Sequence, residues 1–108
     1  MDDGAKAIAD AIKIHSNIIF LEIRGNKIGF IGAKAIAEAL KLTKIKTIDM
    51  RENNIADEGA TAMATVVKCN VVKIIYLSKN NIGDGGALAL AEALKGNTSV
   101  AGFCMEMT

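Results

Sequence analysis

Two carboxylates and two guanidinium groups recur at one interval along this chain and are its strongest candidates for chemistry. The interval that separates Glu22 from Asp49 also separates Arg24 from Arg51. In adjacent strands the two carboxylates would lie about 5 Å apart, where paired carboxylates can share a proton. Each arginine stands two residues further along the same strand, on the same face as the carboxylate, and the two arginines are expected to neutralise the carboxylates. The pattern therefore favours ion pairing over acid–base catalysis.

Other residues give little support for an enzyme. The single histidine, His15, has no nucleophile placed beside it by the repeat geometry. The glycine-rich stretch 83–86 lacks the lysine of a phosphate-binding loop. Cys69 and Cys104 match no metal or redox spacing and are expected to be reduced thiols. We therefore predict no enzyme activity and no cofactor.

The shared interval reflects an internal repeat that must position these side chains. In the stretch 72–95, an alternating apolar pattern is followed by an apolar pattern of helical period. This change of period indicates a short strand, a turn and a helix. The pattern occurs twice more, beginning at positions 45 and 18. Each expected helix also carries a glycine followed by an alanine, at Gly4-Ala5, Gly32-Ala33, Gly59-Ala60 and Gly86-Ala87.

The repeated apolar and asparagine positions resemble the leucine-rich repeat. The pattern LxxLxLxxNxL is matched at 18–28, 45–55 and 72–82, and the period fits the family range of about 20–29 residues. The helical phrase at 32–41, GAKAIAEALK, resembles the ribonuclease-inhibitor-type subfamily, which alternates strands with full helices. The resemblance implies an α/β fold, a right-handed leucine-rich-repeat solenoid that forms a short horseshoe segment.

Strands joined through helical crossovers must be parallel, and the crossovers should be right-handed. Strands about 4.8 Å apart and helices about 10 Å apart force the array to curve. The sheet is then concave and the helices lie on the convex side. We expect one domain over 1–108, either a whole protein or part of a longer array. The expected strands are near 20–24, 47–51, 74–78 and 102–106, and the expected helices are near 2–13, 30–41, 57–69 and 84–95.

The expected helices mostly begin with acidic residues, which suit helix N-termini. Phe30 and Ile31 break this pattern, because two apolar residues stand at the start of the second helix. They are expected either to pack on a neighbouring loop or to form a contact site. The expected N-caps are Asp2 or Asp3, Asp57 and Asp84.

Asn26, Asn53 and Asn80 occupy the asparagine position of the repeat. At this position the chain leaves the strand and turns inward, so backbone donors and acceptors lose their sheet partners. One amide side chain offers two donors and an acceptor. The family resemblance implies a ladder of stacked asparagines. We therefore expect these three residues to be structural rather than part of a binding site.

Side chains that alternate with the core positions are expected on the concave face, in columns that cross the sheet. They differ from repeat to repeat, as a recognition surface requires, whereas the alternative is a solvated sheet with mutually paired charges. Arg51, Tyr76 and Ile74 are the sharpest candidates, since Arg and Tyr are over-represented in binding hot spots. The predicted partner-binding residues are Phe20, Glu22, Arg24, Asp49, Arg51, Glu52, Ile74, Tyr76, Ser78 and Lys79.

The expected function is a protein–protein interaction module that binds a protein partner through the concave face and its rims. The alternative is a GTPase-activating or other regulatory domain of the same fold. The formal net charge of +1, with acids and bases interspersed, gives no reason to expect nucleic acid or an anionic membrane as partner. No apolar run approaches the roughly 20 residues of a membrane helix, and the start does not resemble a signal peptide. A cytoplasmic location is expected.

Neither end of the expected array carries a polar cap of the kind that terminal repeats use. Ile12 and Leu21 at one end, and Phe103 and Met105 at the other, are expected to be exposed. An unpaired last strand would also offer its backbone to another chain. These features predict weak self-association through the uncapped ends.

Overall fold

Helices and strands alternate along the chain. The computed structural model describes residues 2–14, 17–69, 72–96 and 102–104. Each strand covers three residues and is shorter than the stretch expected from the sequence. The elements are α1 (Asp2–Ile12), β1 (Phe20–Glu22), α2 (Phe30–Leu40), β2 (Thr47–Asp49), α3 (Ala56–Lys68), β3 (Ile74–Tyr76), α4 (Asp84–Lys95) and β4 (Gly102–Cys104).

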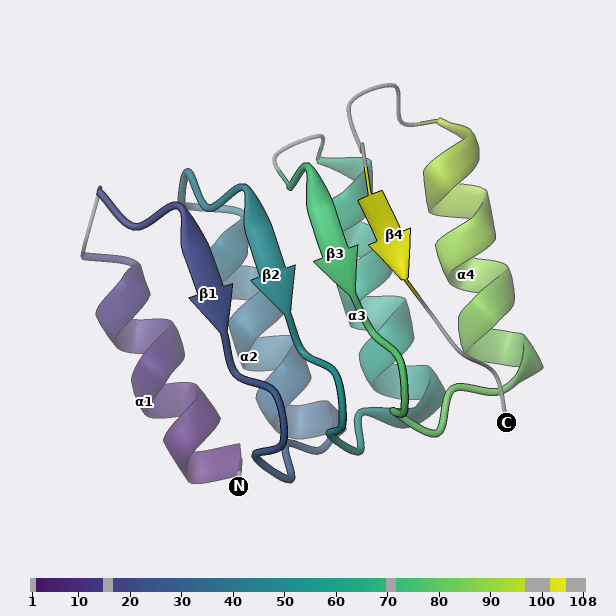
Figure 1. Ribbon diagram of the computed structural model, residues 1–108, viewed down its shortest axis with the longest axis horizontal. Helices are drawn as coiled ribbons and strands as arrows, with labels where there is room; N and C mark the ends of the chain where they lie inside the picture. Colours follow the sequence, from purple (N-terminus) through teal and green to yellow (C-terminus); the bar gives the residue numbers. More distant parts are fainter. Residues whose placement is uncertain (1, 15–16, 70–71, 97–101, 105–108) are drawn as a thin grey trace.

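The strands of the described residues form one parallel sheet in the order β1-β2-β3-β4. Equivalent residues of neighbouring repeats are paired, as in the row formed by Phe20, Thr47 and Ile74. The helices pack on one side of this sheet, and the helix layer is wider than the strand layer (Figure 1). The sheet therefore lies on the inner side of a curved array. The predicted α/β solenoid, with a parallel sheet and helices on its convex side, is confirmed.

The core lies between the sheet and the helix layer, where each repeat contributes the same set of apolar positions. Ile48 and Ile75, the central residues of β2 and β3, are completely buried. Ile36 and Leu40 meet them from α2 and are equally buried. Since each repeat buries its apolar residues against the next, the stack forms one continuous core.

One end of the array differs from the sequence-based expectation. Ile12, predicted to be exposed, is only 3% exposed because it lies on the face of α1 that packs into the core. Leu21 is partly buried against the same core. The prediction is therefore wrong for Ile12. Phe103 and Met105, expected to be exposed at the other end, lie outside the residues whose side chains are described.

A column of asparagine side chains connects the turns. The amide nitrogens of Asn26, Asn53 and Asn80 each donate to the carbonyl oxygen three residues earlier, at 2.8–2.9 Å. Asn53 also donates to the Ile23 carbonyl oxygen at 3.1 Å, and Asn80 donates to the Met50 carbonyl oxygen at 2.8 Å. These second bonds reach into the preceding repeat. The asparagines therefore hold both their own turn and the stacking of the repeats.

The aspartates expected to cap their own helices act elsewhere. Gly29 and Gly83 are the N-cap residues of α2 and α4, and neither helix has a side-chain cap hydrogen bond. Instead, Oδ1 of Asp2 accepts from the Gly29 N–H at 2.8 Å, and Oδ1 of Asp57 accepts from the Gly83 N–H at 2.6 Å. Asp84 lies inside α4 as its first residue. The N-cap predictions for Asp57 and Asp84 are therefore wrong. The carboxylates of Asp2 and Asp57 satisfy the free N–H at the start of the next helix and link neighbouring repeats.

The start of α3 has a different backbone from the starts of α2 and α4. Phe30 stands where the other repeats carry the linking aspartate, so it offers no carboxylate to α3. The N–H of Ala56 donates instead to the Asn80 carbonyl oxygen at 2.9 Å, and Ala56 has a φ of 59°. The equivalent residues Gly29 and Gly83 have φ values of −92° and −99°. An alanine therefore occupies a left-handed conformation at the start of α3.

We expect Ala56→Gly to stabilise the protein by about 0.5–1 kcal/mol. A side chain in the left-handed region costs about 1–2 kcal/mol, of which the extra backbone entropy of glycine offsets a part. The matched control is Gly83→Ala, since φ is negative there and a Cβ would only contact the Asp57 carboxylate at 3.4 Å. Urea unfolding measures both variants. A lower midpoint for Ala56→Gly would contradict the assignment of strain to this residue.

Candidate protein-binding face

The predicted partner-binding residues stand in β1, β2 and β3 or directly after these strands. The sheet lies on the side of the molecule opposite the helices (Figure 1). Phe20 is 55% exposed, whereas Asp49 is only 4% exposed. Glu22, Arg24, Glu52 and Lys79 are exposed, and Arg51, Ile74, Tyr76 and Ser78 are half-buried. We call the set without Asp49 the concave face; it comprises Phe20, Glu22, Arg24, Arg51, Glu52, Ile74, Tyr76, Ser78 and Lys79.

The centre of the concave face holds a carboxylate, a guanidinium group and an aromatic ring in contact. Oδ1 and Oδ2 of Asp49 accept hydrogen bonds from Nε and Nη2 of Arg51 at 2.9 and 2.7 Å. Oδ1 also accepts from the backbone N–H of Arg51 at 3.1 Å. The guanidinium carbon of Arg51 lies 4.8 Å from the centroid of the Tyr76 ring. Such bidentate pairs fix the plane of the guanidinium group, and stacking on an aromatic ring adds to this.

Asp49 has a different role from the one expected for it. It was predicted to contact a partner, but its side chain is buried beneath Arg51. Alternation along the strand does direct Asp49 away from the core, yet the guanidinium group of Arg51 then covers it. Asp49 is therefore the residue that positions Arg51, whose own side chain is 34% exposed. On the concave face the Arg51 cation is therefore partly accessible to solvent, whereas the Asp49 carboxylate is buried.

The contacts with Arg51 lower the pKa of Asp49 below its usual value of 3.8. The largest cause is the side-chain hydrogen bond from Arg51, and burial opposes it by raising the pKa. The backbone N–H of Arg51 and the charges of Arg51 and Arg24 lower it further. These donors and charges favour the ionised carboxylate.

We expect this carboxylate to make folding stability sensitive to acid. Because the pKa is lower in the folded state than in the unfolded chain, the folded state binds fewer protons between the two values. The contribution of the ionised Asp49 side chain to folding stability is fully present above pH 3.8. It is lost as the pH falls through the lowered pKa that Asp49 has in the folded state. Urea unfolding at pH 7 and pH 3 should show a smaller acid-induced loss for Arg51→Met than for the wild type. Equal losses in the two proteins would contradict this assignment.

A second ion pair borders the first. Nε of Arg24 lies 3.6 Å from Oε2 of Glu52, with the side chains 47% and 48% exposed. Oε1 of Glu22 accepts from the backbone N–H of Arg24 at 2.9 Å. Asp49 therefore pairs with Arg51 as expected, whereas the donor to Glu22 is a backbone N–H and Arg24 pairs with Glu52 instead. An exposed pair of this kind contributes little to stability, so its charges are available to a partner.

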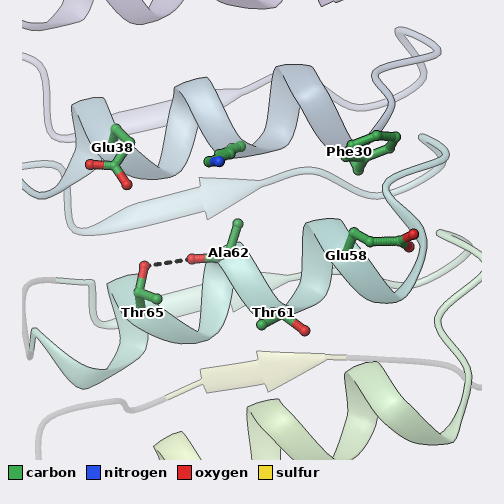
Figure 2. Close-up of a pocket in the computed structure, with 7 residues that line it drawn as sticks. Phe30, Glu38, Glu58, Thr61, Ala62 and Thr65 are labelled. Carbon is green, nitrogen blue, oxygen red and sulfur yellow. Dashed lines mark hydrogen bonds between the residues drawn. The ribbon is translucent and has the colours of Figure 1, made fainter.

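The helix side carries a surface feature that the sequence indicated only in part. The sequence allowed two roles for Phe30 and Ile31, packing on a neighbouring loop or forming a contact site. In the structure they are 48% and 45% exposed. Phe30 borders a groove of about 400 Å³ between α2 and α3 (Figure 2). The sequence analysis did not predict that residues of α3 line a groove, because small and polar residues in a helix do not by themselves indicate a binding surface. We call this feature the α2–α3 groove; it is lined by Phe30, Lys34, Glu38, Glu58, Thr61, Ala62 and Thr65.

Two absences hold for the part of the chain that the structure describes. None of the helices there is long and apolar enough to cross a membrane. Those residues also include no group of three or more His, Cys, Asp or Glu side chains that could hold a metal ion. Cys69 is a free and exposed cysteine. His15 and the side chain of Cys104 lie outside the described residues.

Comparison with known proteins agrees with this architecture. The family model described as "Leucine Rich repeat" matches residues 15–37, 41–64 and 68–91, the segments that contain the three ladder asparagines. The solved structure of "Leiomodin-1 Actin-Binding Site 2 (ABS2)" is similar with a TM-score of 0.90. The two chains are 19% identical, and the match covers 99% of this chain and 64% of the other, so this chain spans less than two thirds of that relative. No curated protein matches the sequence significantly. At this identity the structural likeness establishes the fold.

Proposed function

This chain belongs to the leucine-rich repeat family, and from this premise we propose that it binds a protein partner through its concave face. Domains of this family generally mediate protein–protein interactions. The concave face suits this role, because a repeated scaffold holds side chains that differ from one repeat to the next. The finer assignment to the ribonuclease-inhibitor-type subfamily stays a prediction, supported by the full helices that alternate with the strands.

The observation that carries the proposal is the fixed geometry of Arg51 and Tyr76. Arg51 is held by three hydrogen bonds to the Asp49 carboxylate and stacks on the Tyr76 ring. A partner that meets these side chains does not have to immobilise them, which lowers the entropic cost of binding. Arginine and tyrosine are also among the residue types most often found in binding hot spots. Together they would form the centre of the interface.

The surrounding residues supply chemical selectivity. Phe20 offers an exposed apolar surface on β1, at 55% exposure. The exposed Arg24–Glu52 pair and Lys79 add charges of both signs along the rim. Rim charges of this kind steer encounter and select partners more than they add affinity. The face therefore suits a partner with an apolar group near β1 and carboxylates near Arg51 and Lys79.

Actin is the first protein to test, because the structural relative is named for an actin-binding site. Monomeric and filamentous actin can be tested directly for binding. Nucleotide-loaded small GTPases serve as controls for the regulatory alternative. An unbiased search would place a photo-crosslinking residue at Ser78, on the rim, and in a parallel sample at Glu92, on the convex side. A partner captured only from Ser78 would support the concave face.

We expect Tyr76→Ala combined with Lys79→Glu to weaken partner binding at least tenfold. The pair removes the aromatic ring and reverses a rim charge, but leaves the Asp49–Arg51 ion pair in place. Loss of one hot-spot side chain commonly costs about 2 kcal/mol or more, which exceeds a factor of ten. Isothermal titration calorimetry with the captured partner measures the change, and an unaltered urea midpoint shows that folding is intact. Wild-type affinity in the double variant would place the site elsewhere.

A further inference from the structure

The α2–α3 groove has the dimensions of a helix-docking site. It extends from Phe30 to Glu38, two turns of α2, which corresponds to about 12 Å along the helix axis. Figure 2 shows Phe30 and Glu58 at one end of the groove, and Glu38 and Thr65 at the other. Its volume of about 400 Å³ is enough for one large side chain and its neighbours.

One end of the groove is formed by Phe30, which stands where the preceding and following repeats carry a linking aspartate. In the repeats that contain Asp2 and Asp57, the equivalent side chain turns toward the next helix and bonds to its backbone. Phe30 makes no such bond, and its ring is 48% exposed. The facing helix α3 presents Ala62 and Thr65 to the groove, and these small side chains leave it open. An exposed aromatic ring beside small residues is a favourable site for a partner's apolar side chain.

The charges of the groove indicate what such a partner carries. Glu58 lies at the Phe30 end and Glu38 at the opposite end (Figure 2). Lys34 is the single basic residue of the lining, so the two acids leave the groove with a net negative charge. Glu38 is already near Lys41, at 3.4 Å, but both groups are partly exposed to solvent. An apolar group between two cations complements this arrangement.

We propose that the α2–α3 groove docks an amphipathic helix of a protein partner. This helix inserts one large apolar side chain beside Ala62, midway between the end of the groove with Phe30 and Glu58 and the end with Glu38. It places a lysine or arginine one turn before and one turn after that side chain, opposite Glu58 and Glu38. Residues at i−4 and i+4 are about 12 Å apart on a helix, which equals the length of the groove. A helix suits the site because ridges of side chains pack between neighbouring helices.

A second copy of this chain fits the groove less well. Among the large apolar residues within the described helices, Leu88 of α4 is the most exposed, at 67%. The residues one turn before and after it are Asp84 and Glu92, both acidic. In the groove these acids would face Glu58 and Glu38 and be repelled. The charge pattern therefore selects a basic helix from another protein. This site lies on the opposite side of the molecule from the concave face and does not depend on it.

A pair of designed peptides tests the proposal on the whole chain. Both are helical and carry one central leucine; the first has lysines four residues before and after it, and the second has glutamates there. Fluorescence anisotropy at low ionic strength should show at least tenfold tighter binding of the lysine peptide. Amide chemical shifts should change within 30–38 and 58–65 and not in β1–β3. Absence of binding, or equal affinity for the two peptides, would overturn the proposal.

Variants of the chain separate the groove from other exposed apolar sites. Phe30→Asp removes the ring and restores the acidic residue of the other repeats, and should reduce lysine-peptide affinity at least tenfold. Phe30→Ala should do the same if the aspartate disturbs folding, which the urea midpoint reveals. Leu88→Asp is the matched control and should leave affinity unchanged. Wild-type affinity in both Phe30 variants would refute the site. Sedimentation showing a dimer that Leu88→Asp abolishes would instead identify a second copy as the occupant.

Discussion

Replacing Asn53 with alanine is expected to destabilise the protein by about 3 kcal/mol. Oδ1 of Asn53 accepts from the N–H groups of Asn26 and Ile28 at 2.9 and 3.0 Å. Its Nδ2 donates to the carbonyl oxygens of Ile23 and Met50 at 3.1 and 2.8 Å. Alanine would remove the acceptor of these two N–H groups, whereas the carbonyl oxygens keep the amides of Asn26 and Asn80 as donors. Each buried group left without a partner costs about 1–3 kcal/mol. Since a small domain has only about 5–15 kcal/mol in total, the loss is a large fraction.

Two matched variants separate the ladder from a general loss of packing. Asn26→Ala changes the equivalent residue of the preceding repeat, but Asn26 is exposed, so water can replace the lost bonds and the effect should be smaller. Asn53→Asp keeps the acceptor and the size of the side chain but removes the donors. It also brings a carboxylate against carbonyl oxygens, so it should destabilise nearly as much as alanine at pH 7. Urea unfolding measures all three variants, and an unchanged midpoint for Asn53→Ala would refute the ladder at this position.

The sequence was sufficient to predict the fold because the fold is periodic. Apolar residues such as Ile48 and Ile75 return at the same position of each repeat, and each pair becomes neighbours in the sheet. Register, strand direction and the inward face then follow from spacing alone. The strands are shorter than expected, because a row of backbone bonds, such as Ile23 N–H to Asp49 O at 2.9 Å, continues past them without forming regular strand.

Periodicity could not distinguish contacts within a repeat from contacts between repeats. Asp57 stands where an N-cap is expected, yet its carboxylate bonds to Gly83 in the next repeat. Both arrangements give the same spacing in sequence, so only the geometry decides. The left-handed conformation of Ala56 was equally unpredictable, because spacing alone predicts the same backbone there as at Gly29 and Gly83.

The sequence predicted which residues of the candidate site share one face of the sheet, but it did not predict the contacts between their side chains. Alternation placed Asp49, Arg51 and Tyr76 on one side of the sheet. It could not reveal that Arg51 covers Asp49 and stacks on Tyr76, since these depend on side-chain conformations. The α2–α3 groove was beyond prediction for a similar reason. Phe30 was visible as an irregularity, but the small residues that leave it uncovered belong to a different helix.

The glycine that precedes an alanine in α2, α3 and α4 lies close to the preceding helix. A Cβ added to Gly59 would overlap the Ile55 side chain and lie 3.3 Å from the Ala33 Cβ on α2. At Gly86 it would lie 2.9 Å from the Ala60 Cβ on α3. The glycine of one helix therefore packs against the alanine of the preceding one. This contact explains why the two residues recur together along the chain.

Gly59→Ala is therefore expected to destabilise the protein by about 2 kcal/mol, the typical cost of overpacking a well-packed core. The direction is informative, because the same substitution inside an unconstrained helix stabilises by about 1 kcal/mol. Gly96→Ala is the matched control, since no atom lies within 4 Å of the Cβ it would add. It should leave the urea midpoint unchanged or raise it slightly. A raised midpoint for Gly59→Ala would show that Ile55 and Ala33 can both move aside at little cost, and would contradict close packing as the reason for this glycine.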